Sequence, residues 1–138
     1  MAGGSGRRVL QALVAVIGAV AVLTGVVEVV FGSRLFTGTA PVVADVDSQY
    51  RFFASFWLGA GLVALWVVPR IEPAAGPLRL VMGLMFLGGL SRLVSWVMVG
   101  VPQPMIITLL ALELVVPPIV VFWQSRLAAA SEAASAQV

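Results

Sequence analysis

Between Val9 and Phe31 the sequence reads VLQALVAVIGAVAVLTGVVEVVF, and Glu28 is its only charged side chain. A helix needs about 20 consecutive, mostly apolar residues to cross the hydrocarbon core of a bilayer. This stretch reaches that length, and it exceeds the apolar core of about 7–15 residues found in a cleaved secretion signal. We therefore expect residues 9–31 to be retained as a membrane-spanning helix.

The composition of the chain extends this interpretation to its other segments. Of the 138 residues, 61% are hydrophobic and 10% are charged, whereas a soluble domain is about 45–50% apolar and about 25% charged. Connections that contain Pro or Gly separate the apolar stretches. We predict an all-α integral membrane protein that forms a four-transmembrane-helix bundle as a single membrane domain over 1–138. Its spans lie at about 9–31, 50–68, 78–99 and 105–123, followed by a flexible tail at about 127–138.

The arginines predict how the spans are oriented, because basic residues accumulate on the cytoplasmic side of a membrane protein. Four spans place both termini on one side, and that side carries Arg7, Arg8, Arg70, Arg79 and Arg126. The other side carries Arg34 and Arg51. We therefore predict that both termini are cytoplasmic. Basic residues that are all Arg, with abundant Ala, Val and Gly, indicate a GC-rich bacterial genome, so we expect a multi-pass protein of the bacterial cytoplasmic (inner) membrane.

Three absent residue types exclude much chemistry. Without Cys or His there is no disulfide, no zinc site built on those ligands, no imidazole haem ligand and no Ser-His nucleophile. Without Lys there is no phosphate-binding GxxxxGK[ST] loop. We expect no metal, no cofactor and no catalytic residue. The scattered arginines form no basic patch, so we expect no nucleic-acid binding; the lipid bilayer is the expected partner.

Four charged residues lie within the predicted spans or at their edges, namely Glu28, Arg51, Arg92 and Glu113. A charge at the bilayer centre costs about 2.5–3.5 kcal/mol on insertion scales, so such residues face the protein interior and find partners. At 1.5 Å per helical residue, all four fall in the half of the bundle away from the termini. We predict that they converge on a polar pocket in that outer half.

The sequence around two of these residues supports an inward orientation. Glu28 lies on a stripe of small residues that lets another helix approach closely, formed by Gly18, Ala21, Gly25 and Gly32. Pro117 and Pro118 have no N–H, so the carbonyls of Glu113 and Leu114 lose their helical donors. We expect a helix kink at Pro117 and Pro118, beside the Glu113 carboxylate.

The remaining charges are expected near the membrane surface. The connection from Gly32 to Gln49 is the longest, and Asp45 or Ser48 is expected to cap the second helix. We expect solvated or headgroup-level positions for Arg34, Asp45, Asp47, Arg70, Glu72 and Arg79.

Several short segments resemble a small bacterial family of four-span proteins, catalogued as domain of unknown function 4345. They are Tyr50-Arg51-Phe52-Phe53-Ala54, Leu58-Gly59-Ala60-Gly61-Leu62, Gly88-Gly89-Leu90-Ser91-Arg92-Leu93, Gly100-Val101-Pro102 and Glu113-Leu114. The resemblance covers most of residues 10–125. It implies the four-helix fold and singles out Arg51, Arg92 and Glu113, but it implies no activity.

Three functions remain open on these grounds. The polar pocket would bind a small amphiphile, a lipid headgroup or an ion, as intramembrane charges commonly do. Alternatively, the charges are internal ion pairs of a structural or accessory subunit, which docks another membrane protein or a second copy of itself. An enzyme that uses Glu28 or Glu113 in acid–base chemistry is the least favoured.

Overall fold

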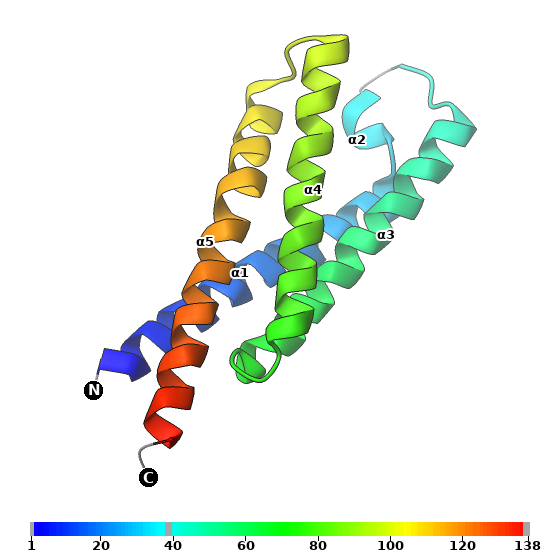
Figure 1. Ribbon diagram of the computed structural model, residues 1–138. Helices are drawn as coiled ribbons and strands as arrows, with labels where there is room; N and C mark the ends of the chain where they lie inside the picture. The colour runs from blue at the N-terminus through cyan, green and yellow to red at the C-terminus, as the bar shows by residue number, and fades with distance from the viewer. Residues whose placement is uncertain (1, 38–39, 137–138) are drawn as a thin grey trace. The chain divides into compact units, whose positions relative to one another are not determined.

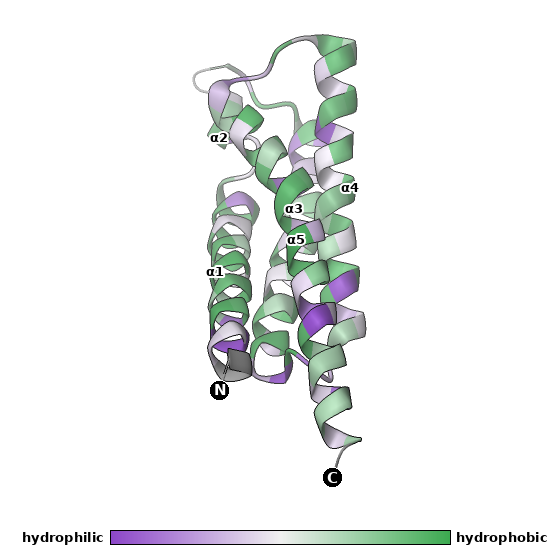
Figure 2. Ribbon diagram, turned by 60° about the vertical axis from the view of Figure 1, so that its left-hand side comes forward, coloured by the Kyte–Doolittle hydropathy of each residue, from purple (hydrophilic) through white to green (hydrophobic). Residues whose placement is uncertain are grey.

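The computed structural model describes residues 2–37 and 40–136, which are almost entirely helical (Figure 1). The long helices are α1 (Ala2–Phe31), α3 (Ala44–Val67), α4 (Ala75–Val99) and α5 (Pro104–Ser135). Two short elements, α2 (Arg34–Thr37) and the 3-10 turn η1 (Val68–Arg70), lie in the connections. Each long helix is long and apolar enough to cross a membrane, and apolar residues predominate along all four (Figure 2). The predicted all-α membrane fold with four spans is confirmed.

The start of α3 differs from the prediction. The helix begins at Ala44, so Asp45 and Asp47 lie in its first turn and not in a loop. Val43 occupies the N-cap position, with no side-chain hydrogen bond, so the expectation that Asp45 or Ser48 caps this helix was wrong. Acidic side chains in a first turn interact favourably with the helix dipole, which lets the helix begin in a polar segment outside the apolar stretch.

The end of α5 also lies beyond the predicted span. Residues 105–123 were expected to cross the membrane, and the helix continues to Ser135. Both Pro117 and Pro118 lie inside this one continuous helix, so the kink stays a prediction. The expected flexibility of the tail is likewise a prediction, and its residues 137–138 lie outside the described residues.

The chain is organised in two compact units, and α1 contributes to both. Unit 1 comprises Met1–Gln11 and Pro69–Val138, and unit 2 comprises Ala12–Val68. In unit 1, α4 and α5 form an antiparallel helical hairpin (Figure 1). Gly100, which ends α4, has φ of +124°, a backbone conformation that favours glycine. A Cβ on Gly6 would lie 3.8 Å from atoms of Trp123 and Leu127, so the first turns of α1 lie beside the C-terminal part of α5.

Unit 2 is built on a close approach between α1 and α3. A Cβ on Gly25 would lie 2.9 Å from Leu58 Cα, and one on Gly61 would lie 2.8 Å from Val22 N. A Cβ on Gly18 would lie 2.9 Å from the Leu65 side chain. Small residues let helix backbones come together in a membrane, where dispersion contacts replace the hydrophobic effect as the driving force. The close approach expected at the small-residue stripe of α1 is confirmed.

We predict that Gly25→Ala destabilises the protein by about 1–3 kcal/mol, the usual cost of inserting a methyl group into a packed contact. The added Cβ meets backbone atoms of Leu58, which cannot rotate away as a side chain can. The matched control is Gly59→Ala, where a Cβ meets nothing within 4 Å. Unfolding of the purified protein in mixed micelles measures both, and equal stabilities would contradict the close packing.

Candidate functional site

Arg92 and Glu113 form an ion pair that joins α4 to α5. Arg92 Nε lies 2.8 Å from Glu113 Oε2, and the side chains are 38% and 11% exposed, respectively. Arg92 is seven residues before the end of α4 at Val99, so it lies about 10 Å along the helix from that end. This depth falls within a hydrocarbon core of about 30 Å. The pair is therefore intramembrane, and the two charges compensate each other.

Glycines on α4 leave the space that the glutamate occupies. A Cβ on Gly89 would lie 3.1 Å from Glu113 Cβ and 2.9 Å from Leu114 Cδ2, and one on Gly88 would lie 4.0 Å from Glu113 Oε2. Any larger residue at position 89 would push α5 away and lengthen the ion pair. Because Pro117 has no N–H, the Glu113 backbone carbonyl lacks its usual helical donor as well.

Arg51, in contrast, has partners within unit 2. Its Nε lies 2.7 Å from Asp47 Oδ2, one turn earlier in α3. Its Nη1 donates hydrogen bonds to the backbone carbonyls of Val29 and Val30, near the end of α1. The last carbonyls of a helix have no intrahelical donor and carry the negative end of its dipole. The Arg51 guanidinium therefore caps the C-terminus of α1.

Asp47, expected to be a solvated or headgroup-level charge, has defined partners in the protein and organises the same cap. Its Oδ1 accepts hydrogen bonds from Ser33 N at 2.7 Å and from Ser33 Oγ at 2.9 Å. Gly32 adopts φ of +63°, and a Cβ there would overlap Asp47 Oδ1. A glycine with positive φ directly after a helix is a common C-terminal signal. The tight turn after α1 thus brings Ser33 to Asp47.

Glu28 lies half-buried one turn before this cap. Its backbone carbonyl accepts a hydrogen bond of 2.8 Å from Gly32 N. Glu28 and Arg51 belong to unit 2, whereas Arg92 and Glu113 belong to unit 1. The structure thus joins Arg92 to Glu113 and Arg51 to Asp47, and the convergence of all four predicted residues on one pocket stays a prediction.

A second polar link between α4 and α5 involves Gln124, which the sequence analysis did not single out. Gln124 is 1% exposed; its Oε1 accepts a bond of 3.4 Å from Arg79 Nη2, and its Nε2 donates one of 3.4 Å to the Ile71 carbonyl. Arg79 Nη2 also donates to Ser125 Oγ at 3.1 Å. The sequence offered one signal for Gln124, namely an uncharged amide side chain at the end of an apolar span. Buried amides are costly without hydrogen bonds, so Gln124 had to have partners.

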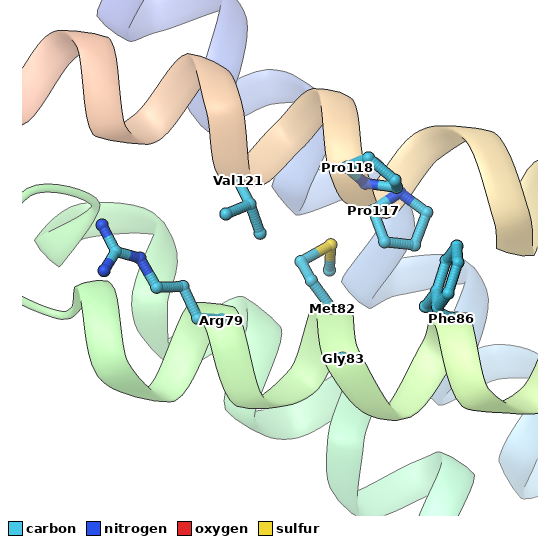
Figure 3. A pocket seen from close by; sticks show the side chains of 7 residues that line it. All are labelled: Arg79, Met82, Gly83, Phe86, Pro117, Pro118 and Val121. Carbon is cyan, nitrogen blue, oxygen red and sulfur yellow. The ribbon is translucent and has the colours of Figure 1, made fainter.

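Between the two polar links, α4 and α5 form a shallow, open groove of about 310 Å³ (Figure 3). Met82 and Phe86 extend from α4, and Pro117, Pro118 and Val121 lie opposite on α5. Arg79 lies at the end of the groove farthest from Phe86. The groove is thus apolar along its length, with one cationic side chain at one end.

We predict that Asp47→Asn speeds amide hydrogen exchange several-fold at the end of α1 and in residues 33–37. An amide is neutral, so it holds the Arg51 guanidinium and the Ser33 N–H less strongly, and the last turn of α1 frays. Asp45→Asn is the matched control, because Asp45 lies in the same first turn of α3 and is exposed. Exchange measured by mass spectrometry checks both variants; unchanged protection in Asp47→Asn would contradict the cap.

Comparison with known proteins gives a family but no activity. No curated protein and no solved structure matches the chain. The family model described as "Domain of unknown function (DUF4345)" matches residues 9–124, a range that contains Glu28, Arg51, Arg92 and Glu113. Because this match covers most of the four spans, the resemblance noted in the sequence is confirmed, and the chain belongs to this family of unknown function.

Proposed function

We propose that the protein is a non-catalytic structural or accessory subunit of a membrane complex. The bond between Arg92 and Glu113, 2.8 Å long with the glutamate 11% exposed, is the observation that carries this proposal. A carboxylate held in such an ion pair links two helices, and its charge is not free to bind a ligand. Arg51 is also engaged, with Asp47 and with α1 carbonyls, which supports the same conclusion.

An internal ion pair gives the α4–α5 hairpin its register. Burying two charges costs free energy that their attraction barely offsets, so such a pair adds little net stability. Shifting one helix by a turn would leave both charges unpaired in hydrocarbon, which costs several kcal/mol. The Arg92–Glu113 pair therefore disfavours every other register and keeps the outer surface of the hairpin constant. A constant surface is what a subunit needs to dock a partner or a second copy of itself.

A second candidate function rests on the exposure of Arg92. Its side chain is 38% exposed, which is unusual for a guanidinium at membrane depth. We propose as the alternative that Arg92 and Glu113, together with Glu28 and Arg51, line an outer-half pocket for a small amphiphile, a lipid headgroup or an ion. The two candidate functions differ in whether they need the charges themselves. Apolar packing can replace a structural ion pair, whereas it cannot replace charges that bind a ligand.

The proposed membrane and orientation rest on the arginines. Five of the eight lie on the side of the termini, so we propose that both termini are cytoplasmic and that the membrane is the bacterial inner membrane. The Arg92–Glu113 pair then lies in the outer half of the bilayer.

We predict that Glu113→Leu destabilises the protein by about 3–5 kcal/mol, because it leaves Arg92 unpaired. The double variant Arg92→Met/Glu113→Leu should regain most of this loss, since apolar pairs replace buried ion pairs at little cost. Glu72→Gln is the control; it breaks the Arg7–Glu72 pair, which is 3.3 Å long with side chains 46% and 30% exposed, and should cost about 0–1 kcal/mol. Unfolding in mixed micelles measures the stability of all three variants. A double variant as unstable as Glu113→Leu would contradict a purely structural role for the Arg92–Glu113 ion pair.

We further predict that crosslinking in the native membrane captures the protein with a partner or a second copy. Native mass spectrometry of the protein released from its own membranes then reports the copy number, the partner and any retained lipid. The double variant Arg92→Met/Glu113→Leu should form the same complex as the wild type. Monomer alone in both measurements would refute the subunit proposal. A retained small molecule that the double variant loses would favour the pocket instead.

A further inference from the structure

The groove between α4 and α5 has the arrangement of groups that an amphiphile requires. Arg79, Met82, Gly83 and Phe86 are spaced at i, i+3, i+4 and i+7, so they share one face of α4. Pro117 and Val121 are spaced at i and i+4 on α5. From Arg79 to Phe86 the groove runs about 10 Å along the helix. Its cationic end lies in the second turn of α4, and its apolar part extends deeper into the span.

The lining determines the chemistry of the occupant. Apart from Arg79, the side chains of the groove are hydrocarbon, thioether and aromatic groups, so a polar solute or an ion would lose its hydration without gaining partners. A volume of about 310 Å³ is at the lower end of the range for ligand pockets, about 300–1,000 Å³. This space suits part of one acyl chain better than a compact polar molecule.

The charge at the end of the groove determines the headgroup. Both hydrogen bonds of Arg79 described above use Nη2 and end on neutral groups of Gln124 and Ser125, so they leave its positive charge uncompensated. A guanidinium has five N–H donors on three nitrogens, and Nε and Nη1 retain the geometry to bind a phosphate. Arg79 is exposed. The surrounding end of unit 1 carries five arginines and two glutamates, namely Arg7, Arg8, Arg70, Arg79, Arg126, Glu72 and Glu132.

We infer that this groove binds an anionic phospholipid of the leaflet in which Arg79 lies. The phosphate contacts the Arg79 guanidinium, and one acyl chain lies along Met82, Phe86 and Pro118 toward the bilayer centre. Arg79 lies about 20 Å along α4 from Arg92, and Phe86, at the other end of the groove, lies about 9 Å from it. The phosphate contact at Arg79 is therefore separate from the ion pair, and the inference goes beyond the proposed structural role.

The test is native mass spectrometry of the full-length, delipidated protein with two lipids of identical acyl chains, phosphatidylglycerol and phosphatidylcholine, at equal concentration. The wild type should retain about fivefold more phosphatidylglycerol than phosphatidylcholine. This is the factor that one basic side chain near an anionic lipid contributes. Arg79→Gln should abolish the preference while lipid still binds. Excess soluble glycerol phosphate should displace neither lipid, because the acyl chain supplies part of the affinity.

Two glycines on α4 give a matched pair of variants. Gly83 lines the groove, and a Cβ there meets nothing within 4 Å, so we expect Gly83→Leu to fold and to place its side chain in the groove. It should reduce bound lipid of both kinds by about fivefold or more. Gly76→Leu, also without neighbours within 4 Å but outside the groove, should bind lipid as the wild type does. Because Gly83→Leu keeps the Arg79 side chain itself, it tests the groove even if Arg79→Gln fails to fold.

Arg126→Gln is the control for general attraction between basic proteins and anionic lipids. Arg126 is exposed, lies over the Phe122 ring at 5.7 Å and does not line the groove, so its loss should leave the preference unchanged. If Arg126→Gln and Arg79→Gln lose the preference for phosphatidylglycerol equally, the preference comes from the general surface charge, and the proposed site is contradicted. Equal retention of the two lipids by the wild type, unchanged binding in Gly83→Leu, or displacement by glycerol phosphate would each overturn it as well.

Discussion

Within the hydrocarbon core of a membrane, each backbone polar group and each charge must find its partner in the protein, and the structure depends on this constraint. Helices satisfy the backbone within each span, so four apolar stretches become four long helices. The charged side chains at membrane depth follow the same rule. Arg92 bonds Glu113 across the α4–α5 hairpin, and Arg51 bonds Asp47 and the last carbonyls of α1. Each of these arginines links two helices of its own unit.

The two units use the same kinds of residue for different purposes. In unit 2, glycines bring α1 and α3 into backbone contact, and the polar network of Ser33, Asp47 and Arg51 closes the turn between them. In unit 1, Gly89 makes room for the Glu113 side chain, while Gln124 forms a second link near the opposite end of the hairpin. The α4–α5 groove lies between these two links, and Pro117 and Pro118 line it on the α5 side.

This arrangement bears directly on function. Arg92 and Arg51 each have a protein partner, which favours a structural role for them over catalysis or transport. Arg79 differs, because its hydrogen bonds end on neutral groups beside an apolar groove. The α4–α5 groove therefore supports a candidate site at Arg79, in addition to the intramembrane charges that the sequence singled out. An arginine near the end of a span does not by itself indicate a site, because arginines are common there.

The sequence by itself determined the membrane class, the number and approximate position of the spans, and the inward-facing stripe of α1, because hydropathy and helical periodicity depend only on local residue order. It also singled out Arg92 and Glu113, since charges in apolar segments are conspicuous. Only the tertiary structure decided which charge pairs with which, that α3 starts early enough to bring Asp47 to Ser33, and that Gln124 joins α5 to the segment before α4. These contacts join residues 14 to 53 positions apart, and partners at such separations are chosen by helix packing, which no local pattern encodes.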